Sequence, residues 1–108
     1  DMIKIMKQVQ EMQSKVAGVQ EALAAMNVTG EAGGGLVKVT MNGRGEMRQV
    51  KIDPSLMVAS DVAMLEDLIV AASTDAKNKA DAAAQTKMQE VTAGLPLPPG
   101  MSLPGLKF

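Results

Sequence analysis

Along the first 26 residues of the chain, apolar residues recur at alternating steps of three and four. This heptad repeat is the seam of a coiled-coil helix, and such a narrow stripe cannot be buried without a second helix beside it. We therefore predict a long first helix over residues 2–27 that packs on another helix, in this chain or in a partner. The seam consists of Met2, Ile5, Val9, Met12, Val16, Val19, Leu23 and Met26.

The 108 residues are enough for one domain, but their apolar side chains are mostly small or flexible. There are ten methionines and a single aromatic residue, Phe108. Such a composition buries little apolar area per residue, and oligomerisation is a common remedy. The chain has no cysteine and no histidine, which removes disulfides, thiolate chemistry and the commonest general base. No membrane-spanning run or signal-peptide pattern is apparent, so we expect a cytoplasmic protein without membrane contact.

A strand pattern follows three consecutive glycines at positions 33–35. Val37, Val39 and Met41 alternate with polar residues, which predicts a half-buried strand. Residues 42–45 form an Asn-Gly-Arg-Gly turn, and a second strand is expected over residues 46–52, before an Asp-Pro stop. Residues 28–32 are a candidate for a short third strand at the edge.

A three-residue loop over residues 43–45 sets the expected register of this hairpin. The expected pairs are Met41 with Met47, Val39 with Gln49, Leu36 with Ile52 and Thr40 with Arg48. Both sheet faces then carry apolar residues, so we expect one face to pack on this chain's helices and part of the other to meet a partner. The candidate dimer-interface residues are Val37, Val39, Met41 and Met47.

A second long helix is expected from an N-cap at Ser60 to about Thr92. Its first half is aliphatic and should cover the sheet, whereas its second half is alanine-rich and should form a thin arm. The expected stripe is Val62, Leu65, Ile69, Ala72, Ala76, Ala80 and Ala83. Residues 1–93 then form one domain, and residues 94–108 form an apolar tail rich in proline and glycine. This tail either docks on the body or a partner, or is loose.

No arrangement of residues supports catalysis. The glycine-rich residues 30–35 lack the Gly-Lys-Ser/Thr sequence of a phosphate loop. They are expected to follow a helix and open a strand, so we interpret them as a flexible connection. We therefore expect no enzyme activity, catalytic residue, metal site, cofactor or small-molecule substrate.

Charge is segregated along the chain although the net charge is −1. Residues 36–52 carry +3, residues 53–75 carry −5 and residues 76–89 carry +2. This pattern fits either a basic binding surface or an ordinary solvated surface. Phosphate contacts to duplex DNA would suit the basic residues, and the lack of aromatic residues disfavours single-stranded partners. The candidate DNA-binding residues are Lys4, Lys7, Lys15, Lys77, Lys79, Lys87, Lys38, Arg44, Arg48 and Lys51.

Residues 28–56 read VTGEAGGGLVKVTMNGRGEMRQVKIDPSL, which closely resembles the signature of the YbaB/EbfC family of small bacterial nucleoid-associated proteins. Residues 6–13, 64–72 and 94–101 resemble the family's first helix, second long helix and tail. The resemblance therefore covers nearly the whole chain. Gln49 is a departure, because family members often carry a basic residue there.

The resemblance implies an α+β fold with a long helix, a small antiparallel sheet and a second long helix, assembled as a tweezer-like homodimer. It further implies a DNA-binding protein of the cytoplasmic nucleoid, with a role in nucleoid organisation and gene regulation and without a cofactor or enzyme activity. The family's helical arms would place the DNA contacts on Lys4, Lys7, Lys15, Lys77, Lys79 and Lys87. The alternative is a dimeric protein–protein interaction scaffold that does not bind DNA directly.

Overall fold

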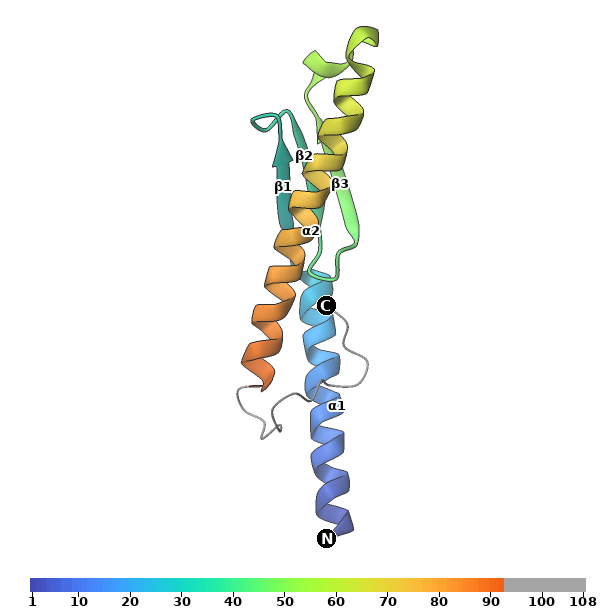
Figure 1. Ribbon diagram of the computed structural model, residues 1–108. Helices are drawn as coiled ribbons and strands as arrows, with labels where there is room; N and C mark the ends of the chain where they lie inside the picture. Colours follow the sequence, from blue (N-terminus) through green and yellow to red (C-terminus); the bar gives the residue numbers. More distant parts are fainter. Residues whose placement is uncertain (93–108) are drawn as a thin grey trace.

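The computed structural model describes residues 1–92 as an elongated α+β unit of 69 × 24 × 17 Å (Figure 1). The expected helix–sheet–helix order and the candidate third strand are both confirmed. The tail expected over residues 94–108 lies outside the described residues. The elements are α1 (Met2–Ala25), β1 (Val28–Ala32), β2 (Val37–Met41), β3 (Met47–Ile52), the 3₁₀ turns η1 (Pro54–Leu56) and η2 (Ala59–Asp61), and α2 (Val62–Thr92).

The heptad seam of α1 packs on α2 along only part of its length. Val19 and Leu23 are buried against Ala84 and Met88, and Met12 and Val16 border this cluster. The two helices run in opposite directions here, so the seam forms one side of an antiparallel two-helix arm (Figure 1). Residues 2–9 of α1 expose their apolar side chains. The expected helix partner is thus within the same chain from Met12 onward.

A line of small residues at intervals of four forms the buried edge of α2. Ala72, Ala76, Ala80 and Ala84 are each at most 2 % exposed. Ala72 and Ala76 belong to the core under the sheet, whereas Ala84 packs on α1. Alanine permits a close approach of backbones, and a single helix face therefore holds the sheet and then the arm.

Three details of the expected second helix are wrong. Ser60 lies inside η2 rather than at an N-cap, and α2 begins at Val62 as a continuation of that turn. Val62 was expected on the buried stripe, but its side chain is 53 % exposed. At the other end of the stripe, Ala84 rather than Ala83 continues the fully buried line.

The sheet is antiparallel in the order β1-β2-β3, and α2 crosses the face that carries Val37, Val39 and Met41 (Figure 1). The glycines at positions 33–35 form the turn between β1 and β2, with φ angles of 65°, 69° and 94°. These left-handed conformations favour glycine. The expected helix-to-strand connection is therefore wrong, because the residues before the glycines form β1.

The expected hairpin register is right only next to the turn. Met41 pairs with Met47, but a β-bulge follows and leaves Arg48 as the extra residue. Each later partner in β3 is shifted by one position, so Val39 pairs with Val50 rather than Gln49. The two other expected pairs are wrong for the same reason, since the observed pairs are Val37 with Ile52 and Thr40 with Gln49.

The bulge places the apolar residues of β3 on the same face as those of β2. Val50 and Ile52 lie opposite Val39 and Val37, on the face toward α2. The opposite face presents only polar side chains, in two rows across the strands. These rows are Glu31–Lys38–Lys51 and Thr29–Thr40–Gln49. The expectation of apolar residues on both sheet faces is therefore wrong.

The outer edge of β1 is closed by two side chains of α2. The Glu31 backbone amide donates to the Asp75 carboxylate at 3.0 Å, and the Lys79 ammonium donates to the Thr29 carbonyl oxygen at 3.0 Å. Asp75 and Lys79 also form an ion pair of 3.2 Å one helical turn apart. One amide and one carbonyl group of the edge strand that would otherwise be available to another chain are thereby occupied.

Candidate nucleic-acid interface

Three lysines lie on an exposed face of α1, away from the apolar seam. Lys4, Lys7 and Lys15 fall within about one third of the helix circumference at 3.6 residues per turn, with Glu11 among them. Each side chain is exposed, and none is within ion-pair distance of a carboxylate in residues 1–92. This face can therefore offer its charges to an external anion.

The three lysines of α2 are arranged differently, because each contacts a carboxylate of its own helix. Lys77 pairs with Asp81 at 2.6 Å, Lys79 with Asp75 at 3.2 Å and Lys87 with Glu90 at 3.6 Å. The whole of α2 contains five acidic residues and three lysines, so the helix has a net charge of −2. An anion approaching this side would have to compete with these carboxylates. The structure thus separates the two sets of arm lysines that the sequence treated alike.

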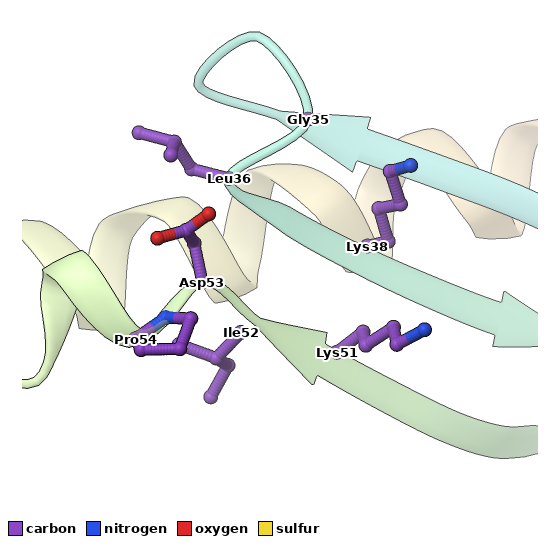
Figure 2. A pocket seen from close by; sticks show the side chains of 7 residues that line it. All are labelled: Gly35, Leu36, Lys38, Lys51, Ile52, Asp53 and Pro54. Carbon is purple, nitrogen blue, oxygen red and sulfur yellow. The ribbon is translucent and has the colours of Figure 1, made fainter.

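The polar face of the sheet brings together Lys38 and Lys51. They are direct partners on β2 and β3, and both are exposed. Their side chains border an open pocket of about 210 Å³, and Figure 2 shows them extending in the same direction. The segment from Val28 to Ile52 contains four basic residues and two acidic ones, Glu31 and Glu46, which gives it a net charge of +2. It is the most basic segment of the fold in residues 1–92.

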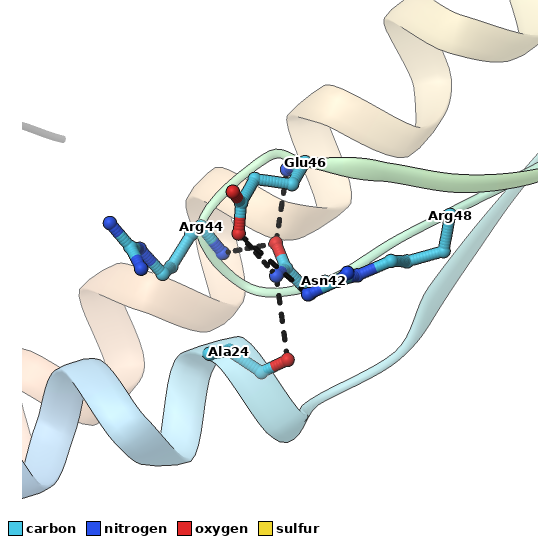
Figure 3. Close-up of polar contacts among 5 residues, drawn as sticks. All are labelled: Ala24, Asn42, Arg44, Glu46 and Arg48. Carbon is cyan, nitrogen blue, oxygen red and sulfur yellow. Dashed lines mark hydrogen bonds and ion pairs between the residues drawn. The ribbon is translucent and has the colours of Figure 1, made fainter.

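A buried asparagine organises the turn that carries Arg44. The Asn42 side-chain oxygen accepts hydrogen bonds from the Arg44 and Glu46 backbone amides, each at 3.0 Å. Its amide nitrogen donates to the Glu46 carboxylate at 2.8 Å and to the Ala24 carbonyl oxygen at 3.4 Å (Figure 3). Asn42 is 0 % exposed. It therefore joins the hairpin turn to the C-terminal end of α1.

The same hydrogen bonds also affect the pKa of the Glu46 carboxyl. The hydrogen bond from Asn42, with the positive charges of Arg44 and Arg48, holds the pKa of the Glu46 carboxyl below its ordinary value. Glu46 and Arg48 also form an exposed ion pair of 3.8 Å. Arg48 is therefore partly neutralised, whereas Arg44 has no ion-pair partner among residues 1–92.

The predicted dimer-interface residues fall into two groups. Val37 and Val39 are 0 % exposed and Met41 is 6 % exposed, because α2 covers all three in a single chain. They have almost no surface to offer a partner in this conformation. Met47 is 48 % exposed, and Val50, which was not among the candidates, is 40 % exposed. The β-bulge explains the omission, since it turns Val50 to the apolar face.

Other kinds of site find little support within the described part of the chain. Residues 1–92 contain no group of three or more metal-ligating side chains. None of the helices described is long and apolar enough to cross a membrane.

Sequence reasoning missed the roles of Asn42, Asp75 and Lys79. Asn42 was assigned only to a turn, and Lys79 only to a DNA-binding set. Neither the contact of Asn42 with Ala24 nor the contact of Asp75 with Glu31 follows from local spacing, because each joins distant segments. The only sequence signal was the Asn-Gly-Arg-Gly-Glu stretch, whose polar residues exceed what a simple turn requires.

Comparison with known proteins gives a consistent assignment. The family model described as the YbaB/EbfC DNA-binding family matches residues 1–95. A nucleoid-associated protein of Agrobacterium fabrum is 60 % identical over 104 residues, which cover 96 % of this chain and 97 % of the relative. Nucleoid-associated proteins of Rhizobium meliloti and Brucella ovis are 52 % and 51 % identical with the same coverage.

The fold also matches a solved structure. The crystal structure of an uncharacterized protein from Helicobacter pylori superposes with a TM-score of 0.75 at 22 % identity, covering 84 % of this chain and 96 % of that chain. At this identity the likeness concerns the fold alone. The family match over residues 1–95 and the relatives above 50 % identity show that the chain belongs to the YbaB/EbfC DNA-binding family.

Proposed function

We propose that this chain is a nucleoid-associated protein that binds duplex DNA as a homodimer, mainly through contacts to the phosphate backbone. The observation that carries the proposal is the set of lysine and arginine side chains left without an ion pair in residues 1–92, all of them on α1, on the strands or in the β2–β3 turn. They are Lys4, Lys7, Lys15, Lys38, Arg44 and Lys51. Unpaired, exposed cations gain most from phosphate, since no intramolecular ion pair has to be broken.

Membership of a DNA-binding family and the names of the relatives support the same function and a place in the nucleoid. A binding role is favoured over an enzymatic one because the family description and the relatives' names refer to DNA binding and the nucleoid rather than to a reaction. Backbone contacts position a protein without reading bases. We therefore assign it a role in nucleoid organisation and gene regulation, with low or modest sequence specificity.

The homodimer is supported by apolar surface that α2 leaves uncovered. Met47 and Val50 of β3 are 48 % and 40 % exposed, on the face where β2 is fully buried. Six apolar residues between Leu56 and Leu65 line a further pocket of about 220 Å³, and two of them, Met57 and Val58, are 69 % and 51 % exposed. A small domain gains stability when such a surface is covered by a second copy.

The alternative function, an interaction scaffold without direct DNA binding, is favoured by the exposed apolar start of α1. Met2, Ile5 and Val9 continue the seam beyond the contact with α2 and are 78 %, 58 % and 48 % exposed. A helix of another protein could pack on this stripe. The charge of the neighbouring lysine face would then be incidental.

Salt dependence of DNA binding separates the two functions. We expect the logarithm of the association constant for a labelled duplex to fall linearly with the logarithm of salt concentration. Replacing Lys4, Lys7 and Lys15 by glutamine should make the slope shallower by up to about 2.7 per protomer, at about 0.9 for each phosphate that is no longer neutralised. Lys87→Gln, which removes one ion-paired lysine, is the comparison and should change the slope by clearly less than the roughly 0.9 expected for one unpaired lysine that contacts phosphate.

The result that would decide against DNA binding is equally direct. Absence of a mobility shift at low salt, or an affinity independent of salt, would favour the scaffold. Equal changes of the salt slope per lysine replaced on α1 and on α2 would instead show that the ion pairs of α2 do not limit the contribution of its lysines to DNA binding.

A further inference from the structure

The lysine pair on the polar sheet face is an unusual combination of charges. Lys38 and Lys51 are direct cross-strand partners, and like charges placed directly opposite one another destabilise a sheet. Both side chains are exposed, so burial does not force them together. Their proximity therefore lowers stability in the absence of an anion.

The nearby carboxylates do not neutralise this pair. Glu31 is the cross-strand neighbour of Lys38, yet no ion pair within 4.0 Å joins it to either lysine. Asp53 lines the same pocket, but its carboxylate accepts a hydrogen bond from the Ser55 backbone amide at 2.9 Å. Figure 2 shows both lysine side chains directed away from Asp53.

Polar neighbours extend the lysine pair into a surface suited to a sugar–phosphate backbone. The adjacent row of the sheet presents the hydroxyls of Thr29 and Thr40, 3.5 Å apart, and the exposed amide of Gln49. Hydroxyl and amide side chains commonly contact phosphate and sugar oxygens. No aromatic side chain is present in residues 1–92 to stack on a base, so this face is suited to a duplex backbone rather than to unstacked bases.

We propose that Lys38 and Lys51 together form a phosphodiester-binding seat on the open face of the sheet, separate from the lysines of the helical arm. This inference rests on the proposed function and assigns to the sheet a contact of its own with the duplex backbone. A phosphate between the two ammonium groups adds two attractive interactions that offset the repulsion between them. The sheet then contacts the DNA backbone in addition to the helical arm.

The test compares duplex binding by the 108-residue chain and three double variants. Lys38→Gln with Lys51→Gln removes two charges from each seat and should make the salt slope shallower by up to about 1.8 per protomer. The control, Asn78→Asp with Gln85→Glu, changes the net charge equally at exposed positions of α2 and should alter the slope less. Lys38→Arg with Lys51→Arg keeps both charges and should retain most of the slope.

Two further measurements exclude indirect effects. Thermal unfolding of the glutamine variant should occur at the wild-type temperature or slightly above it, because a repulsive pair has been removed. Chemical modification of lysine amines, read by mass spectrometry, should show Lys38 and Lys51 protected when duplex DNA is added. Protection without DNA would mean that a second copy or another protein covers the pair, and would overturn the seat.

Failure of the seat is distinguishable from failure of the proposed function. A wild-type salt slope in the glutamine variant, with DNA binding intact, would reject the seat and leave the function standing. Absence of salt-dependent DNA binding by the wild-type chain would reject both. A large loss of thermal stability in the glutamine variant would reject the premise that the pair is repulsive.

Discussion

The backbone amide of Gly43 donates a hydrogen bond of 2.7 Å to the carbonyl oxygen of Leu23, which joins the tip of the β2–β3 hairpin to the last turn of α1. A Cβ atom at position 43 would lie 2.9 Å from the Leu23 side chain, so only glycine fits without a shift. Asn42 adds a contact to the next carbonyl of the helix, that of Ala24. The Leu23 carbonyl oxygen also accepts the backbone amide of the C-cap residue Met26 at 3.2 Å, so the hairpin adds a second donor to Leu23 and supplies one to Ala24.

Replacement of Asn42 by alanine is expected to destabilise the protein strongly. The buried side chain serves two backbone amides and one helix carbonyl, and its removal leaves these groups without partners. We expect a fall of about 2–3 kcal/mol in the free energy of unfolding, measured by urea denaturation. Gln49→Ala, at an exposed position of β3, is the control. A change below about 0.5 kcal/mol for Asn42→Ala would contradict the assigned role.

Two glycine-to-alanine substitutions should have opposite effects. At Gly30 a Cβ atom would lie 2.2 Å from the backbone nitrogen of Ala76, so β1 would have to move away from α2. We expect a loss of about 1–3 kcal/mol or more. At Gly18, inside α1, nothing lies within 4 Å of the added atom, and alanine should stabilise the helix by about 0.5–1 kcal/mol. Equal thermal melting temperatures for the two variants would disprove the close contact.

The contacts that Asp75 makes at the β1 edge should affect how the free energy of unfolding changes with pH in the acid range. The hydrogen bond from the Glu31 backbone amide, together with Lys79, holds the pKa of Asp75 below its ordinary value of 3.8. The unfolded chain therefore takes up this proton at a higher pH than the folded chain. Stability from Asp75 is complete above about 3.8 and is lost as the pH falls through the lower folded-state pKa.

Asp75→Asn should consequently flatten the decline of stability at acid pH, as followed by urea midpoints over a pH series. Asp67→Asn, at an exposed position of the same helix, provides the comparison. An unchanged acid profile in Asp75→Asn would mean that the edge contact contributes nothing to stability. Asp53 and Glu46 also have lowered pKa values, so part of the decline should persist in either variant.

A charge at Val50 is expected to separate the proposed dimer while leaving the protomer folded. Val50 is 40 % exposed in the single chain, so aspartate can remain solvated there. In a dimer the same carboxylate would be buried without a partner, at a cost of several kcal/mol. Sedimentation equilibrium should show a shift to monomer. Val9→Asp, at a position 48 % exposed on α1, should remain dimeric. Dimers of unchanged stability in Val50→Asp would place the interface elsewhere.

The sequence alone could predict the elements with the strongest periodicity. The heptad of α1 and the alternation of Val37, Val39 and Met41 each state which side of an element is apolar, and the structure confirms both. The two-helix arm followed because a narrow seam requires a neighbour of similar length. Val28–Ala32 was less certain, since five residues around a glycine carry a weak strand signal.

The sheet register could not be predicted, because it depends on one additional residue in β3. The bulge at Arg48 leaves the turn unchanged but shifts every later partner by one, which moves each side chain to the other face. The expected pairing of Val39 with Gln49 failed for this reason, since Val50 lies beside Val39. For the candidate site, the sequence supplied the cations, but only the fold shows which of them Asp75, Asp81 and Glu90 already engage.

The closed edge of β1 has a consequence for how many copies can assemble. Strand β3 is the other border of the sheet, and no hydrogen bond to α2 comparable to those of Asp75 and Lys79 covers it in residues 1–92. A sheet with one available border can accept only one neighbour through that border. When two copies pair through their β3 strands, neither has a further open strand edge for another copy. Association by this route therefore stops at a dimer and cannot extend into a filament.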